Sequence, residues 1–77
     1  MRDKLSQDYL DWSIEAQKAQ IELRKGNRML AEECQFSRQY VTSITAGRRE
    51  AHDAVRLISK RLSILPPKYM QRMQDAK

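Results

Sequence analysis

Turn signals divide this chain into short segments, and this division limits the folds open to it. The signals stand at Gly26, at Gln35 to Ser37, at Gly47 and at the pair Pro66 and Pro67. Between them, apolar residues recur at intervals of three and four, the period of one face of a helix. With 77 residues, two glycines and two prolines, the sequence predicts one small all-α domain followed by a tail.

The first helix is predicted from Ser6, its N-cap, to about Lys25. One apolar stripe has the spacing of an ordinary core, and its members are Tyr9, Trp12, Ala16, Ala19 and Leu23. A second stripe lies on another side of the same helix and consists of Leu10, Ile14 and Ile21. Two stripes need two surfaces, so either the carboxyl-terminal tail or a dimer partner is expected to cover the second.

Three further helices follow in quick succession. Gly26 is expected to end the first helix in the left-handed conformation, and Asn27 to cap the second, which spans about residues 28–34. Ser37 caps a third helix, about 38–45, and a fourth covers about 50–62, where Glu50 and Asp53 form a solvated start. Pro66 and Pro67 prevent its continuation.

The second and third helices have the spacing of a helix-turn-helix, over about residues 28–45. Inward positions fall at Leu30, Cys34, Phe36, Val41 and Ile44. The small Ala31 lets two short helices cross steeply, and the third helix needs only a narrow inward stripe when its other face enters a groove of DNA.

The string LAEECQFSRQYVTSITAGRR resembles the Cro/CI, or XRE-like, family of bacterial and phage transcription regulators, and the resemblance covers about residues 9–62. It implies a compact lambda-repressor-like helix-turn-helix domain of four or five helices, here residues 1–65. In this family the second helix lies across the DNA backbone and the third enters the major groove. Members usually have glycine where this chain has Gln35, so a left-handed glutamine is expected there. Residues 66–77 form a tail, as a short helix or a disordered segment.

Charge is unevenly distributed along the chain. The formal net charge is +5 and the isoelectric point about 9.7. Residues 1–23 carry a net charge of −2, whereas residues 37–61 carry +4. A positive region around the third helix suits a phosphate backbone, because neutralised phosphates release counterions.

The outward face of the third helix supplies the candidate base readers. With Val41 and Ile44 inward, the opposite side carries Arg38, Gln39, Thr42 and Ser43. Arginine pairs bidentately with guanine and glutamine with adenine, while a threonine methyl contacts the methyl of thymine. In the family, base-contacting positions correspond most directly to Arg38, Gln39 and Ser43.

Candidate phosphate contacts flank this helix on both sides. They are Asn27, Arg28, Ser37, Tyr40, Arg48 and Arg49. The start of the second helix offers backbone amides to an anion, and in the family it commonly rests on the DNA backbone. For the arginines the alternative is a solvated surface charge, and for Tyr40 it is partial burial of the ring.

Several kinds of chemistry are not expected. His52 is the only histidine and Cys34 the only cysteine, so no Cys/His metal cluster is predicted, and Cys34 is expected as a buried apolar residue. No glycine-rich phosphate loop occurs, and we expect neither catalysis nor a cofactor. No apolar run has the length of a membrane span, so a cytoplasmic protein, nucleoid-associated when bound to DNA, is expected.

Two functions follow as expectations. The first is a small Cro-like regulator from a phage or mobile element, which binds a double-stranded DNA operator as a homodimer. The second is an antirepressor or antitoxin that contacts a repressor or toxin protein. Its contact surface would be the second stripe of the first helix or the tail, with Tyr69, Met70 and Met73.

Overall fold

The computed structural model describes residues 5–70, which form an all-α, helix-turn-helix-like domain and contain no strand. Its helices are α1 (Gln7–Leu23), α2 (Asn27–Cys34), α3 (Arg38–Thr45) and α4 (His52–Leu62), and residues 68–70 are helical as well. The predicted fold class is therefore confirmed. None of the helices within residues 5–70 is both long enough and apolar enough to cross a membrane.

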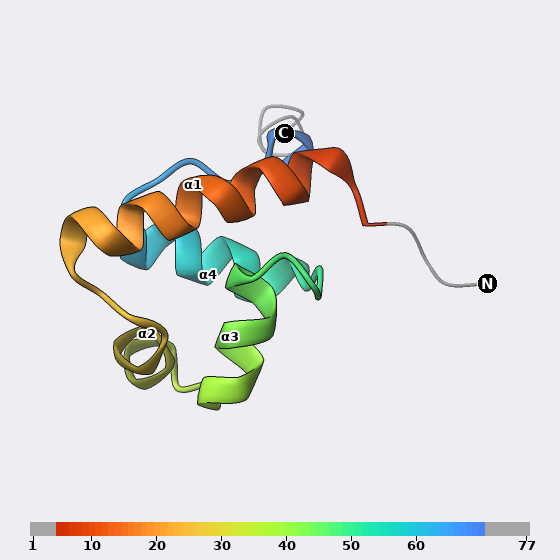
Figure 1. Ribbon diagram of the computed structural model, residues 1–77. Helices are drawn as coiled ribbons and strands as arrows, with labels where there is room; N and C mark the ends of the chain where they lie inside the picture. The colour runs from red at the N-terminus through yellow and green to blue at the C-terminus, as the bar shows by residue number, and fades with distance from the viewer. Residues whose placement is uncertain (1–4, 71–77) are drawn as a thin grey trace.

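The helices form two layers. In Figure 1, α1 and α4 run side by side in the same direction in the upper layer, and α2 and α3 lie below them. The same view looks along α2 while α3 runs across it, the steep crossing expected of a helix-turn-helix. The most extensive contact between two helices joins α2 to α3, so these two short helices form one unit beneath the upper layer.

Two predicted N-caps and one predicted turn are confirmed. The Oγ atoms of Ser6 and Ser37 accept hydrogen bonds from the backbone N–H groups of Tyr9 and Tyr40, each at 3.1 Å. Each bond satisfies an amide that the first turn of a helix leaves without a partner. Between α2 and α3, Gln35 has φ 61°, the left-handed conformation that was predicted for it and that glycine adopts most readily.

The predicted link between α1 and α2 is wrong in detail. Arg24, with φ 56°, takes the left-handed position, and its N–H bonds to the carbonyls of Gln20 and Ile21, so that α1 ends at Leu23. Gly26 is extended, with φ −78°, and serves as the N-cap of α2, while Asn27 is the first residue of that helix. Arginine adopts the left-handed turn at a modest cost, so glycine is not required there.

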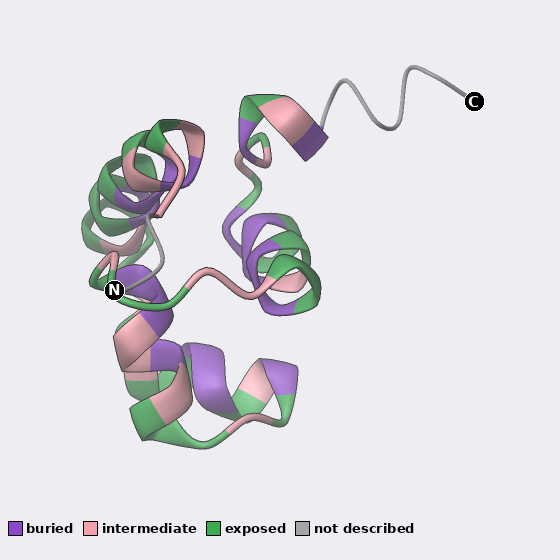
Figure 2. Cartoon of the chain, turned by 90° about the vertical axis from the view of Figure 1, so that its right-hand side faces the viewer, coloured by how far each residue is buried: buried purple, intermediate pink, exposed green. Residues whose placement is uncertain are grey.

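The core lies between the two layers. Figure 2 shows the buried residues facing one another across the interior. They include most of the apolar residues that were predicted to point inward: Tyr9, Trp12, Ala16, Ala19, Leu30, Ala31, Cys34, Val41, Ile44, Ala54, Val55, Ile58 and Leu62. Leu23 is an exception, with 48% of its surface exposed. As the last residue of α1, it lies at the rim of the core.

The second stripe of α1 is only partly covered. Leu10 packs against the core, but Ile14 and Ile21 are 54% and 77% exposed. The described part of the tail instead inserts Met70, which is 2% exposed, into the core. It therefore does not cover Ile14 and Ile21. Met73 lies outside the described residues.

Candidate nucleic-acid interface

The two faces of α3 differ sharply, as its spacing predicts. Val41 and Ile44 are completely buried. On the other side, Arg38 and Gln39 are exposed, and Thr42 and Ser43 are partly exposed. The structure thus places the four predicted base readers on one accessible polar face of a short helix whose opposite face is fixed in the core.

An open hollow joins this face to the loop after α3. It is lined by Arg38, Gln39, Thr42, Ser43 and Arg48. The Arg48 N–H donates to the carbonyl of Ser43 at 3.0 Å, which fixes the start of the loop against the last turn of the helix. The hollow therefore brings together the four predicted base readers and one predicted phosphate contact.

The hydroxyl of Ser43 is partly engaged by its own helix. It donates to the carbonyl of Tyr40 at 2.8 Å, a local bond that serine often makes within a helix. A hydroxyl oxygen has lone pairs beyond its one proton, so Ser43 can still accept a hydrogen bond from an outside donor. Of the four side chains, Arg38 and Gln39 carry the larger sets of donors.

The buried side chain of Tyr9, for which only a place in the core was predicted, fixes the end of α3. The hydroxyl of Tyr9 donates to the carbonyl of Ile44 at 2.6 Å and accepts the N–H of Arg49 at 3.3 Å. Burial raises the pKa of this hydroxyl, the bond from Arg49 opposes the rise, and the nearby charge of Glu50 adds to it. One side chain of α1 thereby positions both the last turn of α3 and the loop that carries the arginines.

Asn27 links three helices. Its Oδ1 accepts from Gln20 Nε2 of α1 at 2.8 Å and from Thr45 Oγ1 of α3 at 3.0 Å. A neighbouring bond from Gln17 Nε2 to the carbonyl of Thr45, at 2.8 Å, ties α1 to α3 again. These bonds fix the Asn27 side chain through its amide oxygen, and a phosphate would instead accept from its Nδ2 or from the backbone N–H groups at the start of α2.

Arg28 and Ser37 lie outside the hollow. Arg28 is exposed and forms a long ion pair, 3.8 Å, with Glu32 one turn further along α2. Such an exposed pair is weak, about 0.3–0.5 kcal/mol, and leaves the guanidinium accessible. Ser37 is exposed at the start of α3, where its hydroxyl serves as the N-cap.

Tyr40 is partly buried, as one of the two alternatives predicted. Its ring packs edge-on against Phe36, with centroids 5.1 Å apart. The guanidinium of Arg49 lies 5.0 Å from the centre of the same ring, within the range of a cation–π interaction. The ring therefore holds Arg49 against the end of the motif, while Arg48 lines the hollow.

Gly47 permits the close approach of this loop to α1. Its φ is 81°, and a Cβ atom built on it would lie 3.2 Å from the Oγ of Ser13. A side chain at this position would meet both an unfavourable backbone conformation and a crowded neighbour. Glycine thus allows the chain to turn directly from α3 into the arginine pair.

Glu50 is not the solvated residue that was predicted. Its carboxylate accepts from Ser6 N and Oγ, at 3.1 and 2.8 Å, and from the hydroxyl of Tyr69 at 2.5 Å. Burial by itself would raise the pKa of Glu50, but the hydrogen bonds from Tyr69 and Ser6, with the nearby His52, hold the pKa below its ordinary value. Contacts 44 and 19 residues away satisfy this side chain, which local sequence cannot reveal.

Cys34 is buried and unpaired within the described part of the chain, and burial raises the pKa of its thiol. Since a thiolate is the reactive form, this environment suits an inert packing residue. Among residues 5–70, no three histidine, cysteine or carboxylate side chains gather as a metal site would require.

In comparisons with known proteins, no family model, no curated protein and no solved structure matches this chain.

Proposed function

We propose that this protein binds double-stranded DNA sequence-specifically, as a small Cro-like transcriptional regulator of a phage or mobile element. The observation that carries the proposal is the exposed polar face of α3, where Arg38, Gln39, Thr42 and Ser43 share one hollow with Arg48. α3 enters the major groove, where these side chains read base edges. A protein with this function acts in the cytoplasm and is associated with the nucleoid when it is bound to its operator.

The flanking groups fix the register of α3 on the duplex. Arg48 and Arg49, after α3, contact one phosphate backbone, and the first amides of α2 with Arg28 contact the other. Because one recognition helix reads a half-site only, a homodimer binds two half-sites about one helical turn apart. No cofactor takes part in this proposal.

The test is selection from a pool of random duplexes, together with the DNA upstream of the protein's own gene, at low and near-physiological salt. We expect enrichment of a palindromic site and binding that weakens steeply as salt rises. Salt-sensitive binding without any enriched sequence, or no binding, would contradict the proposal.

A second candidate function rests on Ile14 and Ile21, which are exposed by 54% and 77%. An antirepressor or antitoxin would use them to contact a repressor or toxin. The tail is less suited to this role, because Met70 is buried and Tyr69 is bonded to Glu50. Binding that Ile14→Asp abolishes and that barely responds to salt would favour this candidate over DNA binding.

A further inference from the structure

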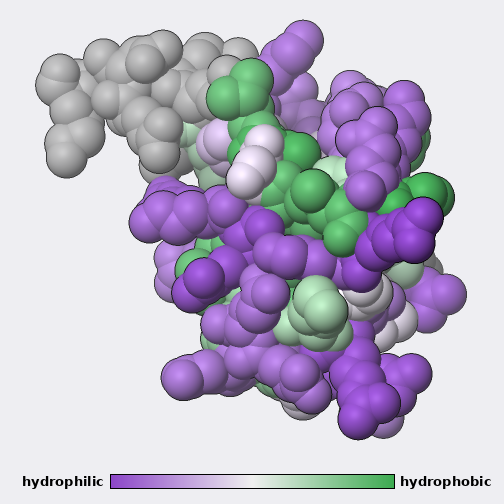
Figure 3. Space-filling view, turned by 90° about the vertical axis from the view of Figure 1, so that its left-hand side faces the viewer, coloured by the Kyte–Doolittle hydropathy of each residue, from purple (hydrophilic) through white to green (hydrophobic). Residues whose placement is uncertain are grey.

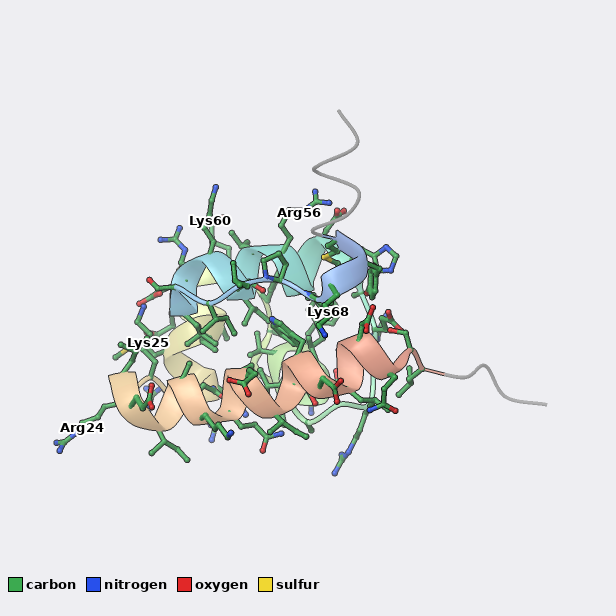
Figure 4. The ribbon with its side chains drawn as sticks, turned by 90° about the horizontal axis from the view of Figure 1, so that it is seen from above. Arg24, Lys25, Arg56, Lys60 and Lys68 are labelled. Atoms are coloured by element: carbon green, nitrogen blue, oxygen red, sulfur yellow. The ribbon has the colours of Figure 1, made fainter. Side chains whose placement is uncertain are left out.

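The top of the upper layer carries opposite charges on its two sides. Figure 4 looks down on it: residues 63–67 run between α1 and α4, and Arg56 and Lys60 project from α4 on the side away from α1. We call Arg56 and Lys60 the basic strip. On the α1 side of the same segment lies the acidic strip, which consists of Asp8, Asp11 and Glu15.

A groove borders each strip. The groove on the α4 side is lined by Leu57 and Ile64 together with the basic strip, and Asp53 lies at its end. The groove on the α1 side is lined by Trp12 and Leu65 together with the acidic strip, and one cation, Lys68, is also among its lining residues. Each strip thus stands beside apolar surface, the composition of a contact between proteins.

The charges of the basic strip are not neutralised within the described chain. Among residues 5–70, neither Arg56 nor Lys60 forms a salt bridge, and two cations one helical turn apart repel each other. Across the segment, Glu15 has a long exposed ion pair, 3.7 Å, with Lys18. Asp8, Asp11 and Glu15 outnumber Lys68 in their groove, so the two strips differ in the sign of their charge and each would be stabilised by the other.

Exposed apolar side chains accompany these strips. Leu65, on the segment between them, is 73% exposed. Figure 3, which looks at the end of α1, shows hydrophobic atoms gathered over the upper layer and mainly hydrophilic atoms over the lower one. Leu65 lines the groove beside the acidic strip, on the segment that separates the two strips, so a contact over this segment would bury it.

We propose that a second copy of this chain covers the top of the upper layer. A two-fold axis parallel to α1 and α4, along residues 63–67, places the acidic strip of each copy over the basic strip of the other and brings the two Leu65 side chains together. An axis perpendicular to these helices would instead stack acid on acid, so charge selects one arrangement. The proposal rests on this face alone and not on DNA binding.

The test uses two charge-reversed proteins without DNA. One carries Asp11→Lys and Glu15→Lys, and the other carries Arg56→Glu and Lys60→Glu. In sedimentation equilibrium we expect the wild type to dimerise. The dimer dissociation constant of each variant alone should be about 100-fold higher than that of the wild type, or higher still. An equimolar mixture should form a 1:1 heterodimer, because both strip contacts are then complementary again.

General attraction between the variants cannot produce this result. Each reversal changes the charge by two, so the formal net charge of +5 becomes +9 in one variant and +1 in the other, and both remain positive. The helical signal in far-ultraviolet circular dichroism checks that each variant folds. As a second measurement, Leu65→Asp should abolish the dimer, whereas Ile14→Asp should leave it intact.

A wild type that remains monomeric at every concentration, a mixture that fails to associate, or rings and filaments in place of a dimer would each overturn the proposal. Loss of the dimer with Ile14→Asp but not with Leu65→Asp would overturn it as well, and would assign the contact to the second stripe of α1. None of these outcomes depends on whether the protein binds DNA.

Discussion

The two layers of the molecule are held in place differently. In the upper layer, α1 and α4 have 17 and 11 residues and bury apolar side chains along their lengths. In the lower layer, α2 and α3 have eight residues each, too short to be stable alone. The lower layer depends on a few buried apolar side chains and on hydrogen bonds to α1. The candidate DNA-reading face therefore belongs to the part of the protein that the rest must hold in position.

The largest effect is expected where the lower layer inserts into the core. Ile44→Ala should lower the free energy of unfolding by about 2–5 kcal/mol, because it leaves a cavity at a fully buried position. The matched control is Ile21→Ala, the same change at a residue that is 77% exposed, where about 0.5 kcal/mol or less is expected. Urea denaturation measures both, and equal losses would contradict the assigned burial.

In the loop before α4, Glu50→Gln should lower the free energy of unfolding by about 1.5–3 kcal/mol at pH 7, because a charged acceptor of three hydrogen bonds is lost. The folded-state pKa lies below the ordinary value of 4.5. The stability that the carboxylate supplies is thus complete above about pH 4.5 and is lost as pH falls through the folded-state pKa. Urea denaturation over a series of pH values should show the free energies of unfolding of the wild type and Glu50→Gln converging in acid. A difference that stays constant with pH would contradict this role.

The connection between the layers can be weakened at one atom. Tyr9→Phe removes the hydroxyl that bonds to Ile44 and Arg49 while preserving the ring, and should cost about 1–2 kcal/mol. Amide hydrogen exchange should rise mainly in residues 44–49 and little in the middle of α1. A uniform rise throughout α1 and α4 would show that the hydroxyl supports the whole fold instead.

At the junction after α3, Gly47→Ala should cost about 1 kcal/mol, because φ is 81° and the added Cβ approaches Ser13 Oγ at 3.2 Å. Repeating the change in a Ser13→Ala background separates the two causes. If crowding dominates, Gly47→Ala should lower the melting temperature much less in the Ser13→Ala protein than in the wild type. If backbone strain dominates, the two losses should be equal.

The smallest effect is expected in the turn between α2 and α3. Gln35→Gly should raise stability by about 0.5 kcal/mol, since φ is 61° and glycine tolerates this conformation at a smaller cost. Gln35→Ala retains the strained conformation and serves as the control, with a change near zero. Destabilisation by glycine would show that the glutamine side chain contributes more than its backbone costs.

Local sequence predicted the features that depend on neighbouring residues. Ser6 and Ser37 act as caps, and Val41 and Ile44 point inward, because each of these roles is set within one or two turns of helix. Local sequence did not predict two other features. Glu50 is satisfied by groups far away in sequence, and Arg24 rather than Gly26 takes the left-handed turn.

The candidate site was predictable in outline only. The outward residues of α3 follow from its period, whereas the positioning roles of Tyr9 and Asn27 require the packing of three helices. A tyrosine within an apolar stripe was the one available signal, since a buried hydroxyl needs a bonding partner.

The most direct test of the central claim compares base preferences before and after one change on α3. On the site selected from the random pool, binding is measured for every single-base variant with the wild type, Gln39→Ala and Arg48→Ala. Gln39→Ala should relax the base preference at one position in each half-site, a loss of about 1–3 kcal/mol of discrimination. Arg48→Ala should weaken binding to all sequences alike and should reduce the slope of log affinity against log salt concentration by about one. Identical preference profiles for the wild type and Gln39→Ala would contradict the claim that the outward face of α3 reads the bases.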